Sequence, residues 1–224
     1  MSWVLANLPT IAGHLLAHLL QAVPAIIASF VLAIPIARLA RVARPLRAVL
    51  VTGSSLLYAV PSLALFVILP IILATGIRDP LNVIVALTLY GLALLVPATA
   101  DALDAVDARV LDAATAMGMG RLRCFLTVEL PLAGPAILTG LRVVTVSTIS
   151  LTTVGAVLGV RSLGWLFTDG FQRGITAEIV TGLVATAALA LVLDGLVLAL
   201  GRLCLPWTWK RAGATTSKSQ EGQA

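Results

Sequence analysis

The chain has 224 residues, of which 59% are hydrophobic and only 11% are charged, whereas an ordinary soluble domain carries about 25% charged residues. A soluble globular protein is excluded because a core could not bury this much apolar surface, and a transmembrane β-barrel is excluded because the apolar runs are continuous rather than alternating. The net charge of +5 comes from basic residues at the ends of apolar runs, which is typical of membrane topology and argues against a nucleic-acid partner. The composition therefore predicts an all-α, polytopic transmembrane helical bundle.

Apolar runs long enough to cross a bilayer as helices occur in five places. In chain order, these predicted spans are 18–39, 48–77, 81–100, 133–158 and 179–200. The second run is too long for one upright span, and Pro61 and Pro70 within it indicate a kinked or broken helix. We therefore expect about five spans, with six left open, and a loop or re-entrant segment at 159–178.

The basic residues predict how the bundle is oriented in the membrane. Eleven of the basic residues fall on one side of the predicted spans: Arg38, Arg41, Arg44, Arg47, Arg109, Arg121, Arg123, Arg202, Lys210, Arg211 and Lys218. Only Arg78, Arg161 and Arg173 fall on the other side. Because cytoplasmic loops carry the excess of Lys and Arg, we expect the N-terminus outside, the C-terminus inside, and residues 101–131 in the cytoplasm.

We expect a single domain over residues 1–211, with its core at about 15–205 and no repeated segment. Residues 212–224 are rich in Ser, Thr, Gly and Gln, and are expected to form a disordered cytoplasmic tail. Cys124 and Cys204 both fall on the predicted cytoplasmic side, where disulfides are rare, so we expect two free thiols.

A polar stretch at 101–131 interrupts the apolar pattern and contains the most specific motif. Its positions are an acid and two alanines, then a glycine, then a Val-x-Leu-Pro ending: Asp112, Ala113, Ala114, Gly118, Val128, Leu130 and Pro131. The alanines favour a helix, with Asp112 near its start, where a carboxylate suits the positive end of the helix dipole. Gly118 and Gly120 are expected to end that helix, and a second short helix over 121–130 is expected to stop at Pro131. The prediction is a rigid bend between two short helices.

In residue types and spacing, this motif resembles the EAA loop of ABC-importer permeases, with Asp112 where that family usually has Glu. Three further segments resemble the osmoprotectant branch, which imports glycine betaine, carnitine, choline or proline. They are Tyr-Ala-Val-Pro-Ser-Leu-Ala-Leu at 58–65, Leu-Tyr-Gly-Leu-Ala-Leu-Leu-Val-Pro at 89–97, and Val-Gly-Ala-Val-Leu-Gly-Val-Arg-Ser-Leu-Gly-Trp at 154–165. The likeness covers most of 15–205, and permeases for methionine or other amino acids, which share the same core, remain an alternative.

The resemblance implies a type I ABC-importer permease fold and a multi-pass location in the cell membrane. It implies that 101–131 docks on a separate ATP-binding subunit, which carries the ATP and Mg²⁺, so no cofactor is expected on this chain. The other implied partners are a second permease subunit, identical or a sister chain, an extracytoplasmic solute-binding protein, and the bilayer.

The residues agree that this chain is not itself the enzyme. The only lysines are Lys210 and Lys218, and neither lies in a Gly-x-x-x-x-Gly-Lys-Ser/Thr run, so the chain has no P-loop. No Ser-His-Asp, Cys-His or paired-carboxylate pattern points to a catalytic residue. His14 and His18 share one helix face, but no Cys, Asp or Glu nearby completes a metal site, and we expect them near the outer interface.

Tyr58, Pro61, Ser62 and Tyr90 are the candidates for the pore or its gate. Aromatic faces attract quaternary ammonium groups through cation–π interactions, which suits the solutes that the resemblance implies. The competing interpretation is that these aromatic residues only pack against neighbours or face lipid. The sequence leaves both open.

Charged residues near or within the spans raise further alternatives. Asp194 and Arg142 could serve an ion-coupled carrier as a proton relay; otherwise Arg142 extends toward the interface and Asp194 pairs with a neighbouring helix. Asp101, Asp104 and Asp107 follow one helical ridge, which could face a partner or be a solvated helix end. A membrane-assembly subunit without a transport path is a third class of function.

Overall fold

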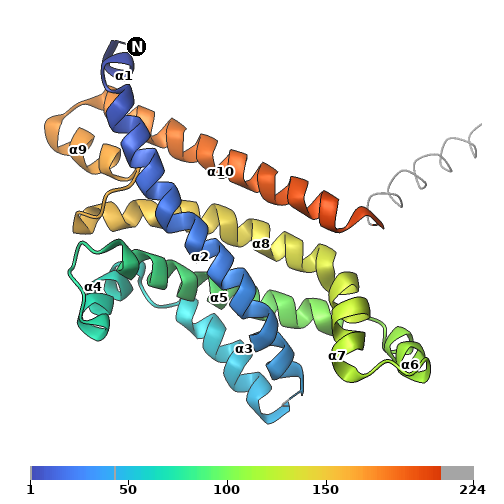
Figure 1. Cartoon of the computed structure of the whole chain (residues 1–224). Helices are drawn as coiled ribbons and strands as arrows, with labels where there is room; N and C mark the ends of the chain where they lie inside the picture. The colour runs from blue at the N-terminus through green and yellow to red at the C-terminus, as the bar shows by residue number, and fades with distance from the viewer. Residues whose placement is uncertain (1, 43, 208–224) are drawn as a thin grey trace, which may run out of the picture.

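The computed structural model describes residues 2–42 and 44–207, and every regular element in this part of the chain is helical (Figure 1). The elements are α1 (Ser2–Ala6), α2 (Leu8–Val42), α3 (Arg44–Tyr58), α4 (Ser62–Leu73), α5 (Pro80–Asp104), α6 (Ala108–Ala116), α7 (Arg121–Cys124), the π-helical η1 (Phe125–Glu129), α8 (Leu130–Thr152), the 3₁₀-helical η2 (Thr153–Leu158), α9 (Trp165–Arg173) and α10 (Thr176–Cys204). The expected tail at 212–224, which includes Lys218, lies outside the described residues, as do Lys210 and Arg211.

The described residues contain four to five candidate spans, against the five or six expected. Four helices are long and apolar enough to span a membrane: α2, α5, the continuous run from Arg121 to Leu158, and α10. The bent pair of α3 and α4 is the fifth candidate when it is counted as one broken span, and the described residues contain no sixth. The N-terminus and the end of α10 lie at opposite ends of the bundle (Figure 1).

The long second run is a broken helix. Helices α3 and α4 meet at an angle of 109°, with the break at residues 59–61. Pro61 stands there with an extended ψ of 129°, whereas Pro70 lies inside α4 without ending it. The expected break is therefore confirmed at Pro61, and Pro70 does not contribute one.

Helix α5 forms the centre of the bundle and packs against α2, α3, α4 and α8. Where α2 crosses α5, a Cβ on Gly91 would collide with the hydroxyl of Ser29, so only glycine permits this approach. The Ser29 hydroxyl donates to the carbonyl of Ala25 at 2.7 Å, and the carbonyl oxygen of Thr88 lies 3.2 Å from it. In lipid, the hydrophobic effect does not drive helices together. Small residues instead stabilise the pair because they let the two helices approach closely. Helix α10, in contrast, lies at the periphery and exposes most of its apolar side chains.

Several helices are longer than their apolar runs predicted. Helix α2 begins at Leu8 rather than near residue 18, so His14 and His18 lie within it and are buried in the protein. The segment 159–178, expected to be a loop or re-entrant segment, contains a short helix, α9, and the first residues of α10. These differences share one cause. Hydropathy locates the apolar centre of a helix, but it does not locate the polar or capped residues at the ends of the helix.

Candidate functional site

The motif-bearing stretch forms a projection at one end of the bundle, beyond the ends of α5 and α8 (Figure 1). We call residues 108–129, which comprise α6, the Gly118 turn, α7 and η1, the elbow. Helix α6 begins at Ala108 because the Asp107 carboxylate accepts a hydrogen bond from the backbone N–H of Arg109 at 2.9 Å. Asp112 therefore lies in the middle of α6, whereas the motif alone predicted a place near the start of the helix.

The Arg109 guanidinium also donates to the Asp107 carboxylate at 2.7 Å, and this hydrogen bond lowers the pKa of Asp107. Because the pKa is lowered in the folded state, the carboxylate stabilises the start of α6 at neutral pH. This stabilisation disappears as the pH falls through the lowered pKa. The cap is thus ionised under all ordinary conditions.

Gly118 makes the turn between the two arms of the elbow. Its φ of +81° is in the left-handed region, and the N–H of Met119 closes the turn on the carbonyl of Ala114 at 3.2 Å. Gly120 has a φ of −66° and precedes α7 as its N-cap. The prediction that both glycines end the first helix is right for Gly118 and wrong for Gly120.

This difference makes a matched test of the turn. Neither glycine has an atom within 4 Å of the position of an added Cβ, so Gly118→Ala and Gly120→Ala differ only in backbone conformation. An L-residue in the left-handed region costs about 1–2 kcal/mol, so Gly118→Ala should destabilise the turn and Gly120→Ala should not. We expect hydrogen exchange at the Met119 amide to rise at least about fivefold in Gly118→Ala alone. Equal exchange in the two variants would show that the turn does not depend on Gly118.

The second arm of the elbow continues into the membrane helix. Pro131 is the second residue of α8 and directly follows the π-helical η1, which joins α8 to α7 without a break. Residues from Arg121 to Leu158 therefore form one continuous helix. The expectation that Pro131 stops a separate short helix is wrong, and any movement of α7 must be transmitted directly to α8.

The motif residues divide into an exposed tip and a partly buried base. Asp112, Ala113 and Gly118 are exposed, Ala114 is buried against the second arm, and Val128, Leu130 and Pro131 are half-buried at the base. Four large apolar side chains of the elbow are also exposed: Val110, Met117, Leu122 and Leu126. The motif did not single these out, although apolar residues within a polar stretch were a visible signal.

Two cations from α2, Arg38 and Arg41, contact the base of the elbow, and Arg47 from α3 pairs with the end of α5 beside it. The Arg38 guanidinium lies 4.2 Å from the centre of the Phe125 ring, and Arg41 forms an ion pair with Glu129. Arg41 also lies 3.4 Å from Asp104, which pairs with Arg47 as well. These contacts tie η1 to α2 and α5, so that the elbow moves with the helices rather than as a free loop.

The predicted acidic ridge is therefore used largely within the chain. Asp104 is bound by two arginines, and Asp107 caps α6, while Asp101 is exposed. Asp104 and Asp107 are both exposed, as expected of a solvated helix end, and the structure adds the arginines that they meet, which sequence spacing alone could not show.

The four pore candidates gather at the break between α3 and α4. The Tyr90 hydroxyl on α5 donates to the carbonyl of Val60 at 2.6 Å, which satisfies a backbone group that the broken helix leaves open. The Tyr58 ring packs edge-on against Tyr90, with centroids 6.1 Å apart. Tyr90 is buried and Tyr58 is half-exposed, whereas Pro61 and Ser62 form the bend itself. Of the two tyrosines, only Tyr58 is exposed.

The two charges predicted within the membrane bind each other. The Arg142 guanidinium on α8 donates to both carboxylate oxygens of Asp194 on α10, at 2.8 and 2.6 Å. The expectation that Asp194 pairs with a neighbouring helix is confirmed, and Arg142 is its partner rather than a side chain that only extends toward the interface. A bidentate pair of this kind leaves no free carboxylate for a proton relay.

Comparison with known proteins identifies the family. Residues 25–209 match the sequence model of the family described as binding-protein-dependent transport system inner membrane component. The chain belongs to this family. It is thus a membrane-embedded transport component, and members of this family are permease subunits rather than enzymes. The permease prediction is confirmed, and it accounts for the structure better than an ion-coupled carrier.

Individual relatives and a solved structure agree with this assignment. The permease is 29% identical over 178 residues to the glycine betaine/carnitine/choline transport system permease protein OpuCD of Bacillus subtilis, a match that covers 79% of this chain and 76% of that protein. It is 33% identical over 151 residues to the ergothioneine transport permease/ergothioneine binding protein EgtU of Helicobacter pylori, which covers 67% of this chain but only 27% of that longer protein. An inward-facing structure of the MetNI methionine ABC transporter shares the fold, with a TM-score of 0.77, 20% identity, and coverage of 91% and 97% of the two chains.

Proposed function

We propose that this permease imports a small solute of the glycine betaine class as the membrane half of an ATP-driven importer. The observation that carries the proposal is the elbow, a projecting unit with an exposed apolar tip and a base bound to two helices of the bundle. A separate ATPase subunit carries the ATP and Mg²⁺, and this chain carries no cofactor. The solute class is supported by the transport activities for which the relatives are named, which include choline, carnitine and glycine betaine.

In the proposed orientation, the elbow end of the bundle lies in the cytoplasm and the N-terminal end lies outside. The cations at the elbow end support this orientation, because Arg38, Arg41, Arg47, Arg109 and Arg121 lie there. The elbow can then meet a cytoplasmic ATPase, and the opposite end can meet an extracytoplasmic solute-binding protein. A second permease subunit, identical or a sister chain, completes the transport path.

Each part of this chain has a role in the proposed mechanism. The tip of the elbow, which includes Asp112, Ala113 and Gly118, docks on the ATPase subunit. Movement of the tip passes through η1 to α8 directly, and to α2 and α5 through Arg38 and Arg41. It ends at the α3–α4 break, where Tyr58, Pro61, Ser62 and Tyr90 form the gate. The ATPase subunit can shift the equilibrium between the inward-facing and outward-facing states only to the extent that its affinities for the two states differ.

Uptake of labelled glycine betaine at high osmolarity tests this proposal. The permease is expressed together with its cognate ATPase and binding protein in cells that lack other uptake systems for the solute. We expect uptake to stop when ATP is depleted and to continue when only the proton gradient is collapsed. Uptake that survives ATP depletion but follows the proton gradient would instead establish a carrier, and ATP-dependent uptake of labelled methionine alone would move the permease to the amino-acid branch.

A further inference from the structure

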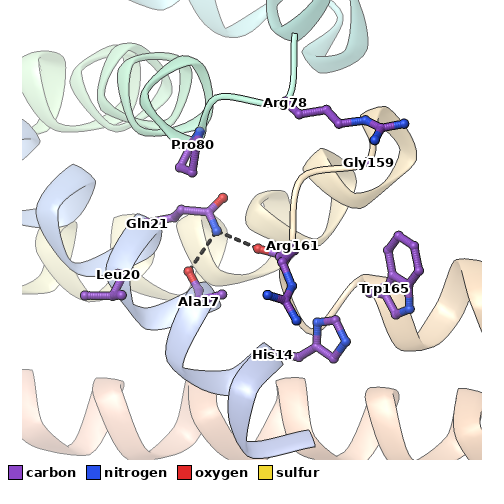
Figure 2. Close-up of a pocket in the computed structure, with 9 residues that line it drawn as sticks. All are labelled: His14, Ala17, Leu20, Gln21, Arg78, Pro80, Gly159, Arg161 and Trp165. Atoms are coloured by element: carbon purple, nitrogen blue, oxygen red, sulfur yellow. Dashed lines mark hydrogen bonds between the residues drawn. The ribbon is translucent and has the colours of Figure 1, made fainter. Parts of the chain in front are cut away.

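A recess with a volume of about 660 Å³ opens at the N-terminal end of the bundle, which is the outer end in the proposed orientation. Its lining comes from α2, from the turn between α4 and α5, and from the linker between η2 and α9 (Figure 2). We call it the outer recess. It shares no residue with the elbow or with the tyrosine gate, so it is a separate surface of the folded bundle.

The charge exposed around the outer recess is positive. Arg78 and Arg161 line it with exposed side chains, and no Asp or Glu lies in the lining. In the part of the chain that the structure describes, neither guanidinium has an ion-pair partner. Asp79 instead caps α5, and Asp169 pairs with Arg173 at 2.9 Å. Outer segments of membrane proteins usually carry few cations, so topology does not account for two unpaired arginines here.

The two arginines are placed for a large partner rather than for a small molecule. Their side chains point in different directions in Figure 2, and both extend from exposed positions. A small molecule inside the outer recess would therefore not bridge the two guanidinium groups. A protein surface that covers the opening can contact both of them at once.

The backbone that carries each arginine is held in place. The Gln21 amide nitrogen donates to the carbonyl of Arg161 at 2.7 Å, which fastens the linker to α2 (Figure 2). The Asn82 amide nitrogen donates to the carbonyl of Gly76 at 2.8 Å, which fixes the turn that carries Arg78. The surface is thus largely formed before a partner arrives, and less ordering entropy is lost on binding.

Apolar side chains are exposed beside the two charges. Leu20 and Trp165 line the outer recess and are 63% and 37% exposed. Ile77 precedes Arg78 in the chain and is 64% exposed. Arginine and tryptophan are enriched at the centres of protein interfaces, where Lys, Glu and Asp are depleted. The outer recess has this composition.

We infer that the outer recess is the docking surface for the extracytoplasmic solute-binding protein, whose carboxylates bind Arg78 and Arg161, an assignment that rests on the proposed function. Guanidinium groups suit carboxylates because they can donate two parallel hydrogen bonds. A second identical subunit would bring the same positive charges to the contact, so it fits this surface poorly. Charges at the edge of an interface act mainly on the association rate and are screened by salt.

Binding of the purified cognate binding protein to the full-length permease in phosphatidylcholine nanodiscs tests this inference. Affinity and association rate are measured by biolayer interferometry at low and high salt. At low salt we expect Arg78→Gln and Arg161→Gln each to weaken binding at least about fivefold, mainly through slower association. Arg161→Lys, which keeps the charge, should lose less, and the differences between variants should shrink at high salt.

Arg173→Gln is the matched control, because Arg173 is an exposed arginine at the same end of the bundle that is already paired and does not line the outer recess. It should bind the binding protein as the original chain does. Recovery of the ATPase subunit through the elbow, at the opposite end, shows that each variant is folded.

Three results would overturn the inference. The first is unchanged affinity in Arg78→Gln and Arg161→Gln, and the second is an equal loss in Arg173→Gln. The third is a loss that appears only in nanodiscs containing anionic phosphatidylglycerol, because the arginines would then bind lipid headgroups.

This inference and the proposed function can fail separately. ATP-dependent uptake of glycine betaine, combined with unchanged capture of the binding protein by the arginine variants, would keep the importer and remove this docking surface. Uptake that needs neither ATP nor the binding protein would remove the importer, and an original chain that then captures no binding protein would remove the docking surface with it.

Discussion

Replacing Met117 with glutamate should abolish recovery of the ATPase subunit when the permease is captured from detergent-solubilised membranes. Met117 is 71% exposed beside the Gly118 turn, so the substitution leaves the fold of the elbow intact. It places a charge in the middle of the apolar tip, where a partner must bury the side chain, and an unpaired charge in such an interface is costly. We expect the recovered ATPase to fall at least about tenfold, which corresponds to a loss of roughly 1.4 kcal/mol in binding.

Phe171→Glu is the control for this experiment. Phe171 is 81% exposed on α9, at the opposite end of the bundle, so the same charge is added to an equally exposed apolar residue outside the spans. Recovery of the ATPase should not change in this variant. Equal recovery with Met117→Glu and the original chain would mean that the tip of the elbow is not the docking surface, and the proposed coupling role would fail with it.

Replacing Arg142 with leucine should destabilise the permease more than any single substitution of an exposed ion pair. The change leaves Asp194 unpaired on α10, in a span whose surroundings are lipid or apolar side chains. An unpaired charge at this depth has neither water nor a counter-ion to stabilise it. We expect the unfolding temperature of the purified permease to fall by more than about 5 °C, and the same for Asp194→Leu.

The double variant and a surface pair provide the controls. Arg142→Leu with Asp194→Leu removes both charges at once, so its unfolding temperature should return to within about 2 °C of the original. Arg173→Leu breaks the exposed pair with Asp169 and should have little effect, because exposed ion pairs contribute little to stability. Single variants as stable as Arg173→Leu would show that the intramembrane pair is not structural.

The double variant also separates the two classes of transport. A permease driven through the elbow needs the pair only for its fold, so ATP-dependent uptake should persist when both charges are replaced. A carrier that moves protons through Asp194 would lose all uptake in the same variant. Loss of uptake in a well-folded double variant would therefore contradict the structural role that the bidentate geometry supports.

The sequence by itself determined the membrane class, the apolar helices and the family, and it placed a helix break at Pro61 or Pro70 without deciding between them. Each of these follows from residues that are close together in the chain. Continuous apolar runs require helices in lipid, Pro61 limits helix continuity locally, and the motif from Asp112 to Pro131 has a fixed internal spacing. Gly118 could be assigned to the turn for the same reason, because its conformation depends mainly on its neighbours.

Only the tertiary structure decided which side chains meet across helices. Arg142 and Asp194 are 52 positions apart, and Gln21 and Arg161 are 140 positions apart, so no local pattern predicts either contact. The ion pair between Arg41 and Glu129, which attaches the elbow to the bundle, also could not be predicted from a local pattern. Nor could the continuity of α7 with α8 despite Pro131. Hydropathy and spacing report on a single helix, whereas the partner of a charged group depends on how helices pack, and packing is settled by the whole chain at once.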